Sequence, residues 1–324
     1  MPTDLWYGAD CETRIGRRAN LATAPTAWQA IDFMSVTVNP TQEWRERAKI
    51  GNPAARHNAL DPIQPRPGFE RVAAELVLDA DSRNLPLWLR YAMGAPATAA
   101  ASALYAHTWA SGGKTEQYFD LAVKVGTTDV RVYEALTLAQ ISANVTGENT
   151  QDFDLNLSLR GLRRATPLTA FSAGTVTAAP AEAPMLRCLF EVDDVAADAF
   201  LSGSFSYDRQ IQEGVFLSAT PTVSKLTPNG GSHSGSATFR AIGAAFDAME
   251  VGQTVFEPAF AYLGLVSGHK IRLEHPQALL APSPMPIQGV GMIERSLNWS
   301  PFQSASAPAA RIVVTNDVTS YASV

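Results

Sequence analysis

The chain is poor in the residues that usually mark a catalytic or metal-binding protein. It has two cysteines, Cys11 and Cys188, and five histidines among 324 residues. The cysteines lie far apart and match no metal-binding spacing, which favours free thiols in a reducing compartment. No two histidines have the H-x-x-x-H spacing found in many zinc sites. The sequence therefore gives no support to a metal-dependent enzyme.

Charge and long apolar runs are also scarce. Asp, Glu, Lys and Arg make up 17% of the chain, and the formal net charge is −6. An acidic chain lacks the excess of cations that holds nucleic acid phosphates. No apolar run is long enough to cross a bilayer, and the start Met-Pro-Thr-Asp-Leu-Trp lacks the pattern of a signal peptide. With 46% hydrophobic residues, the composition predicts a soluble globular protein of one large domain or two ordinary ones.

One short segment, "SKLTPNGGSHSGSATF" (residues 224–239), has the small-residue content of an active-site loop. A nucleophile elbow needs a serine at the centre of its G-x-S-x-G pattern, and the centre of Gly231–Gly235 is His233. A phosphate-binding loop needs a lysine after its glycines, and none follows. We therefore expect a flexible polar connector that leads into a strand beginning near Ala237.

Two other segments contain metal-binding residue types, and a structural explanation is favoured for each. His269 and His275 lie six residues apart beside Glu274, which is more typical of an edge strand or a loop than of a metal site. The segment "DADSRN" (residues 79–84) begins like a calcium loop but has Arg83 where an oxygen ligand belongs. Helix capping is the favoured role of this segment.

Alternation of apolar and polar residues is the main secondary-structure signal. It is clearest at residues 119–125 and 153–160, where every second side chain is apolar, as in half-buried strands. Further strands are predicted at residues 35–38, 73–78, 136–141, 200–207, 271–273, 292–299 and 311–315.

Helices are few. Residues 85–93 are predicted as a helix that Asn84 caps, with Pro86 in the first turn and Gly94 after the end. Residues 256–265 are a second helix candidate. Residues 241–249 are a third, although they could equally continue the strand before them. The fold class is therefore mainly β.

The elements recur in a similar order in the two halves of the chain. We predict two tandem β-sandwich or barrel-like domains, residues 1–165 and 185–324, each with a short flanking helix. Residues 166–184 are a linker or a surface excursion. Each half has a long loop after its first strand pair, at residues 44–68 and 212–235, and loops of this length are usually functional or disordered.

These two loops carry no catalytic pattern, and their small and apolar residues suit an arm that contacts a neighbouring subunit. The candidate contact residues are Trp44, Arg45, Arg47, Ile50, His57, Leu60, Ile63, Val215, Phe216, Leu217, Val223, Leu226 and His233.

Three segments resemble a known family. "GADCETRIGRRANLATAPTAWQAIDFMSVTVNPTQEW" (residues 8–44) looks like the opening of the tail tube proteins, or major tail proteins, of long-tailed, non-contractile bacteriophages. "AELVLDADSRNLPLWLRYAMG" (residues 74–94) is similar to the strand and short helix of that family. "YEALTLAQISANVTGENTQDFDLNLSLRG" (residues 133–161) is similar to its closing hairpin.

The resemblance implies a structural subunit of the virion tail, assembled in the bacterial host cytoplasm, with no catalytic residues, cofactor, metal or membrane contact. Such subunits form stacked rings around a lumen through which genomic DNA passes without specific binding, and other tail proteins join the tube ends. If this chain carries the fold twice, the ring is a trimer with pseudo-sixfold symmetry. An acidic subunit suits a lumen that repels phosphates. The alternatives are another tail or decoration protein with a carbohydrate-binding surface, and a hydrolase with an unrecognised site.

Overall fold

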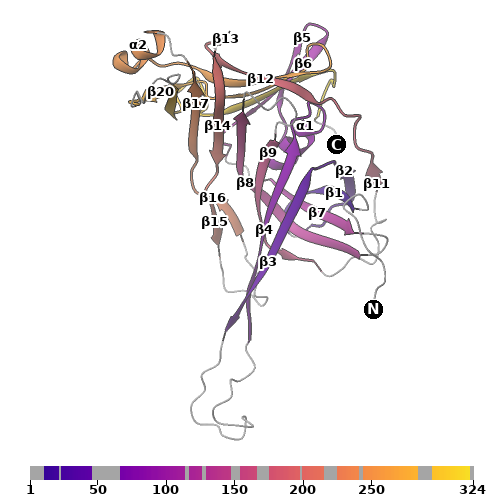
Figure 1. Ribbon diagram of the computed structural model, residues 1–324. Helices are drawn as coiled ribbons and strands as arrows, with labels where there is room; N and C mark the ends of the chain where they lie inside the picture. Colours follow the sequence, from indigo (N-terminus) through magenta and orange to yellow (C-terminus); the bar gives the residue numbers. More distant parts are fainter. Residues whose placement is uncertain are drawn as a thin grey trace, which may run out of the picture.

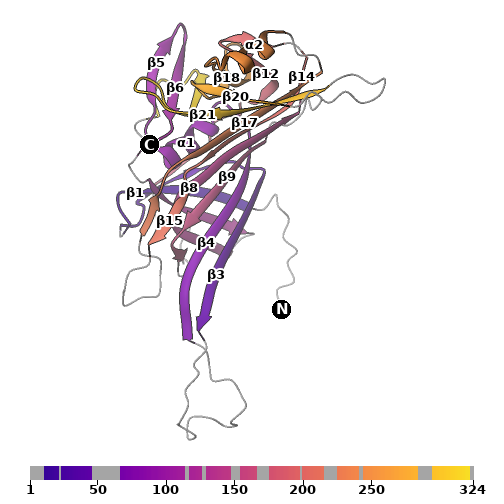
Figure 2. The same cartoon turned by 90° about the vertical axis from the view of Figure 1, so that its left-hand side faces the viewer.

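The computed structural model describes residues 11–21, 23–45, 66–113, 117–125, 129–146, 154–165, 175–197, 199–214, 225–240, 244–283 and 294–321. Within these ranges the chain forms many strands and two short helices, so the expected mainly β fold class is confirmed. Figure 1 shows a tall sheet that narrows into a long hairpin at one end, with a second sheet lying across its other end. Figure 2 shows the strands of the tall sheet running side by side from that hairpin toward the second sheet.

The tall sheet has thirteen strands and contains a continuous array in the order β3-β4-β9-β8-β14-β17-β21-β20. A branch β11-β2-β1-β7 pairs with the first part of β8, and β10 also pairs with β8. The strands are β1 (Cys11–Arg18), β2 (Ala27–Ala30), β3 (Ser35–Arg45), β4 (Arg66–Asp79), β7 (Tyr118–Val125), β8 (Asp129–Thr146), β9 (Asp154–Gly161), β10 (Arg163–Arg164), β11 (Thr175–Thr177), β14 (Phe200–Asp208), β17 (Ser232–Phe239), β20 (Ala278–Ala281) and β21 (Arg295–Pro301).

The second sheet has seven strands in the order β13-β12-β18-β19-β22-β6-β5, and β15 and β16 form a separate hairpin. The second-sheet strands are β5 (Ala97–Ala101), β6 (Leu104–Ala110), β12 (Met185–Val192), β13 (Val195–Ala196), β18 (Pro258–Gly264), β19 (Lys270–Glu274) and β22 (Arg311–Asn316). The remaining elements are β15 (Ile211–Gly214), β16 (Lys225–Pro228), α1 (Leu85–Met93) and α2 (Ala244–Gly252).

The core lies between the two sheets and around α1. Alternation explains the sheet faces: in β9 the leucines at 155, 157 and 159 are buried, and the polar residues between them are partly exposed. Aromatic side chains fill the space between sheets, and Phe190 contacts Phe239 and Phe260 edge-on at centroid distances of 5.4 Å. The helix α1 is buried along almost its whole length, with Trp88 packed edge-on against Phe119.

The helix predicted at residues 85–93 has these bounds, but its predicted cap is wrong. Asn84 makes no capping bond with its side chain. Asp81 takes that role, because its Oδ1 accepts the backbone N–H groups of Arg83 at 2.7 Å and Asn84 at 2.8 Å. Its Oδ2 accepts the N–H of Ala183, so the carboxylate also ties the helix start to a distant segment.

The helix predicted at residues 256–265 is wrong, because this segment contains β18. Residues 258–262 are buried on both faces of the strand, between β12 and β19. A continuous apolar run of this length fits a buried central strand and a helix equally well, so periodicity alone does not separate them. The helix candidate at 241–249 corresponds to α2, although residues 241–243 lie outside the described residues.

The polar connector expected before Ala237 is wrong where the chain is described, whereas the strand expected from Ala237 is confirmed as the end of β17. The described part of residues 224–239 contains no such connector. It forms β16 and β17. In β17, Gly235, Ala237 and Phe239 face the core, and the serines and the threonine between them face outward. The segment is therefore a strand with very small side chains rather than a loop.

Strands from before and after residues 166–184 share both large sheets. In the tall sheet β14 pairs with β8 over seven residue pairs, from Ser202↔Thr146 to Asp208↔Gln140. In the second sheet β22 lies between β19 and β6. The two halves of the chain are therefore joined by backbone pairing as well as by sequence.

Candidate functional surface

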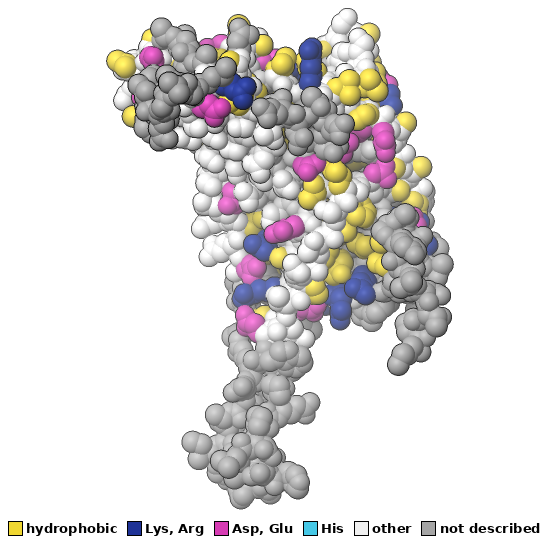
Figure 3. Space-filling view, in the orientation of Figure 1, with side chains coloured by type: hydrophobic (Ala, Val, Ile, Leu, Met, Phe, Trp, Pro, Cys, Tyr) yellow, Lys and Arg dark blue, Asp and Glu magenta, His cyan; other side chains and the backbone are white. Residues whose placement is uncertain are grey.

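One face of the eight-strand array is polar, and its centre carries no charge. Its side chains alternate with the core-facing ones and share this face because cross-strand partners point the same way. We name this set the polar face: Gln140, Ser142, Asn144, Asn156, Ser158, Ser202, Ser204, Ser206, Ser232, Ser234, Ser236, Thr238, Ser296, Asn298 and Ser300. In Figure 3 the left-hand flank over β14 and β17 is correspondingly white, with few coloured side chains.

Short polar side chains on this face form hydrogen bonds with one another across neighbouring strands. The Gln140 amide donates to Ser206 Oγ at 3.0 Å. The hydroxyls of Ser204 and Ser236 lie 2.8 Å apart, as do those of Thr238 and Ser296. Hydroxyls that bond to each other project little into solvent, so the face is smooth, wettable and uncharged.

Charged residues lie at the margins of the polar face. Carboxylates on its side of the sheet include Glu75, Asp79, Asp154 and Asp208, besides the two that pair with Arg71. Two arginines share it near the long hairpin, and one of them, Arg71, pairs with Glu43 at 3.3 Å and Glu213 at 2.9 Å. The other is Arg160, opposite Thr137. The margin is thus mildly acidic, whereas the centre carries no charge.

The two segments with metal-binding residue types, residues 79–84 and 269–275, do not form a cluster of metal ligands. In the first, Asp81 caps α1 as described above. His269 Nδ1 lies 2.8 Å from Ser82 Oγ, and His275 Nδ1 accepts the indole N–H of Trp299 at 2.9 Å. Burial, followed by the charge of His233, lowers the pKa of His275 to about 3, so this ring is neutral at pH 7. No group of three metal-binding side chains occurs in the part of the chain that the structure describes.

Arg18, in β1, has a structural role. Arg18 and Asp120 are both buried and form a two-point ion pair, with Arg18 Nη2 at 2.9 Å from Asp120 Oδ2. Asp120 also accepts the N–H of Ala135 at 2.8 Å. Burial raises the pKa of Asp120, and the bonds from Arg18 and Ala135 oppose that rise.

A sequence family described as phage tail tube protein matches residues 8–301. The chain belongs to the phage tail tube protein family. No curated protein matches it. Family membership assigns this tail tube protein a structural role in the virion tail and implies assembly with further copies of itself. No helix among its described residues is long and apolar enough to span a bilayer.

The contact residues expected in the two long loops of this tail tube protein fall mostly outside the described residues. This applies to Arg47, Ile50, His57, Leu60, Ile63, Val215, Phe216, Leu217 and Val223. Trp44 and Arg45 lie at the end of β3, opposite the start of β4.

The other two expected contact residues lie in strands. Leu226, in β16, is fully buried within the chain, where the hydroxyl of Tyr118 donates to its carbonyl at 3.0 Å. It is therefore not available as a contact for a neighbouring subunit. His233 stacks on Tyr207 at a centroid distance of 4.9 Å and lines a pocket.

The eight-strand array ends in two edges. At one end β3 pairs only with β4 among the described strands, and at the other β20 pairs with β21 and, through Ala278 alone, with Phe256. The edge of β20 is therefore open only beyond Ala278. An unpaired edge offers backbone N–H and C=O groups to a further strand. Sequence reasoning did not locate these edges, because edge position depends on strand pairing between residues far apart in the chain.

Proposed function

We propose that this tail tube protein forms trimeric rings with pseudo-sixfold symmetry, and that the rings stack into a hollow, non-contractile tube through which DNA passes. The observation that carries the proposal is a repeat in strand order. The array reads β3-β4-β9-β8 and then β14-β17-β21-β20. The repeat is clearest when the strands of each set are taken in chain order, β3, β4, β8, β9 and β14, β17, β20, β21. In each set the first strand pairs with the second, and the second pairs with the fourth. The third strand lies beside the fourth, at the far end of the set.

The helices extend this repeat. The helix α1 follows β4, and α2 follows β17. A two-strand hairpin of the second sheet comes next in each case, β5-β6 after α1 and β18-β19 after α2. This correspondence supports the prediction that the chain carries one fold twice, although the two copies share their sheets.

The pairing of β8 with β14 then supplies a template for ring closure. It joins the last strand of the first set to the first strand of the second set in antiparallel fashion. By the same repeat, β20 of one chain corresponds to β8, and β3 of the next chain corresponds to β14. Antiparallel pairing of β20 with β3 repeats the internal contact between chains, and three such contacts close a ring.

The dimensions of such a ring suit DNA. Three chains supply twenty-four strands, and at about 4.8 Å per strand the sheet circumference is about 115 Å, or about 160 Å with a strand tilt of about 45°. The corresponding backbone diameter is roughly 37 to 52 Å, which leaves room for a DNA duplex after side chains are added. A ring of six whole chains has twice that diameter.

The polar face suits the inside of this ring. Uncharged hydroxyl and amide groups offer no cations for phosphates to bind, and the mildly acidic margin repels them. A duplex can therefore move past the surface without stopping. The lining is less acidic than the net charge of the chain suggests, because the centre of the face is uncharged.

Stacking is assigned to the two hairpins that leave the array. The ends of β3 and β4 reach beyond the rest of the sheet in Figure 1, and β15 and β16 extend in the same direction from β14 and β17. We propose that residues 44–68 and, within the predicted loop 212–235, residues 212–225 contact the next ring or the next subunit.

Electron microscopy of tubes assembled from the purified protein tests the proposal. Threefold rings with a pseudo-sixfold cross-section are expected, and six whole chains per ring would rule out the duplicated-fold arrangement. A variant that lacks residues 51–65 should remain folded and fail to form tubes. Tubes of normal length from that variant would refute the role of the first arm.

A further inference from the structure

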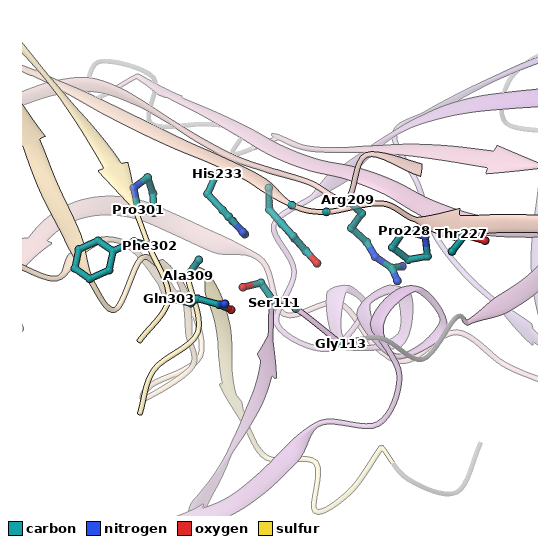
Figure 4. Close-up of a pocket in the computed structure, with 14 residues that line it drawn as sticks. Ser111, Gly113, Arg209, Thr227, Pro228, His233, Pro301, Phe302, Gln303 and Ala309 are labelled. Atoms are coloured by element: carbon teal, nitrogen blue, oxygen red, sulfur yellow. The ribbon is translucent and has the colours of Figure 1, made fainter. Parts of the chain in front are cut away.

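A pocket of about 700 Å³ lies where the ends of several strands meet on the core side of the array. Its walls come from residues 111–113, 207–209, 227–233 and 301–309, which are far apart in sequence. Figure 4 shows Arg209 and Pro228 toward one end, Phe302 and Gln303 toward the other, and Ser111 between them. Part of the glycine- and serine-rich segment 224–239 forms one wall.

Arg209 is a buried cation without an acidic partner. It is 5% exposed, and its Nη1 donates to the carbonyl of Leu138 at 3.4 Å. It also contacts the hydroxyl of Tyr207. Among the described residues Arg209 forms no ion pair with a carboxylate. A buried charge is costly unless it is paired, and a guanidinium has five N–H donors, so these contacts leave donors to spare.

The groups around Arg209 are suited to an anion. The described lining contains no acidic side chain. It offers the hydroxyls of Ser111 and Tyr207, and glycines that allow close approach of a ligand to the backbone. His233 Nδ1 is buried and has no hydrogen-bond partner, and burial lowers the pKa of this ring so that it is neutral at pH 7. A neutral imidazole can carry its proton on Nδ1 and donate it.

We infer that this pocket binds an oxyanion, a carboxylate or a phosphate group, through Arg209 with help from Tyr207 and Ser111. The planar guanidinium matches two oxygens of such a group, and the burial of Arg209 strengthens the pairing because its charge is poorly hydrated. Two sources fit this chemistry. One is a small anion from solution, and the other is an acidic side chain of a neighbouring copy in the tube. The second source alone rests on the proposed function.

The test begins with the unassembled protein. Inorganic phosphate and acetate are titrated at constant ionic strength while Tm is recorded. For a free anion, Tm should rise saturably in the wild type. Arg209→Gln should weaken binding at least about tenfold, because a hydrogen bond to a charged group contributes about 1.5–3 kcal/mol. Arg240→Gln, at an exposed arginine that pairs weakly with Glu294, is the matched control and should respond like the wild type.

Two further variants keep the test decisive if Arg209→Gln does not fold. Arg209→Lys retains the positive charge but lacks the planar guanidinium group that can bind two oxygens. Tyr207→Phe retains the aromatic ring that stacks on His233 but lacks the hydroxyl. Both should weaken anion binding, by less than Arg209→Gln.

Assembly distinguishes the two sources. If no anion binds the unassembled wild type, the remaining source is a carboxylate of a neighbouring copy. In that case folded Arg209 variants should assemble poorly, while Arg240→Gln should assemble normally. The inference is overturned if the wild type and the Arg209 variants respond alike to both anions and assemble alike. Failure of the wild type itself to form tubes would count against the proposed function and leave the anion titration unaffected.

Discussion

A lysine in the centre of the polar face should convert the bore of the tube into a DNA-binding surface. Asn144 is exposed there, opposite Ser204 in the β8–β14 pairing. Because the side chain is on the surface, Asn144→Lys should change the stability of the subunit by less than about 0.5 kcal/mol. In a trimeric ring it adds three cations per ring to a surface whose centre otherwise has none.

The magnitude follows from the sheet. The fourteen residues of β4 span about 45 Å at 3.3 Å per residue. With a tilt of about 45°, one ring then covers about 30 Å of the bore and faces about 20 phosphates of a duplex. If all three lysines reach phosphates, raising salt from about 50 to 200 mM should weaken binding about 40-fold per ring.

The assay is cosedimentation of purified tubes with linear duplex DNA at the two salt concentrations. Wild-type tubes should not retain the duplex, and Asn144→Lys tubes should retain it at low salt and release it at high salt. Ala99→Lys is the matched control, because it adds the same charge on the exposed strand β5 of the second sheet. Closed circular DNA cannot enter the bore. Equal binding of linear and circular DNA by Asn144→Lys tubes would therefore refute the assignment of this face to the lumen.

Three further predictions concern the subunit itself and are measured by denaturant unfolding. Asp120→Asn should cost about 3 kcal/mol, because it removes the nearer carboxylate of the buried Arg18 and leaves Glu134, at 3.6 Å, as its ion-pair partner. His275 has a folded pKa of about 3, below its unfolded value, so its neutral form adds stability that is lost as pH falls below about 6.5. From pH 7 to 5 the wild type should lose about 2 kcal/mol more than His275→Gln, which can still accept from Trp299; equal losses would contradict the assignment. Gly235→Ala places a Cβ 2.3 Å from the Trp299 ring and should cost about 1–3 kcal/mol, whereas Gly113→Ala meets no atom within 4 Å and should be nearly neutral.

Local sequence patterns were sufficient for part of the fold. The alternating leucines of β9 and the proline and glycine that bracket α1 are signals that neighbouring residues carry by themselves. The cap of α1 was missed because Asp81 acts from three residues before Asn84, and no local rule favours it over the asparagine. Strand β18 was missed because its apolar run has no period that separates strand from helix.

The polar face was visible in the sequence and was misinterpreted. Serines alternate with other residues at 202, 204 and 206 and again at 232, 234 and 236. Serine and glycine have low strand propensity, so the second run was interpreted as a connector. The pairing of β14 with β17 aligns the two serine runs, and the pairing of β8 with β14 adds Ser142 and Asn144 to the same face. These pairings join residues about thirty and about sixty positions apart, and local periodicity contains no information about them.

The position of β22 has a consequence for synthesis in the cell. This strand, residues 311–316, fills the gap between β19 and β6, so the second sheet has a missing central strand until residue 316 has left the ribosome. A nascent chain can pair β3 with β4 early, but it cannot complete the layer that covers α1 and the core. A nascent chain that has been synthesised only as far as β21 therefore has an unfinished second sheet, and we expect it not to assemble with its neighbours until β22 has been added.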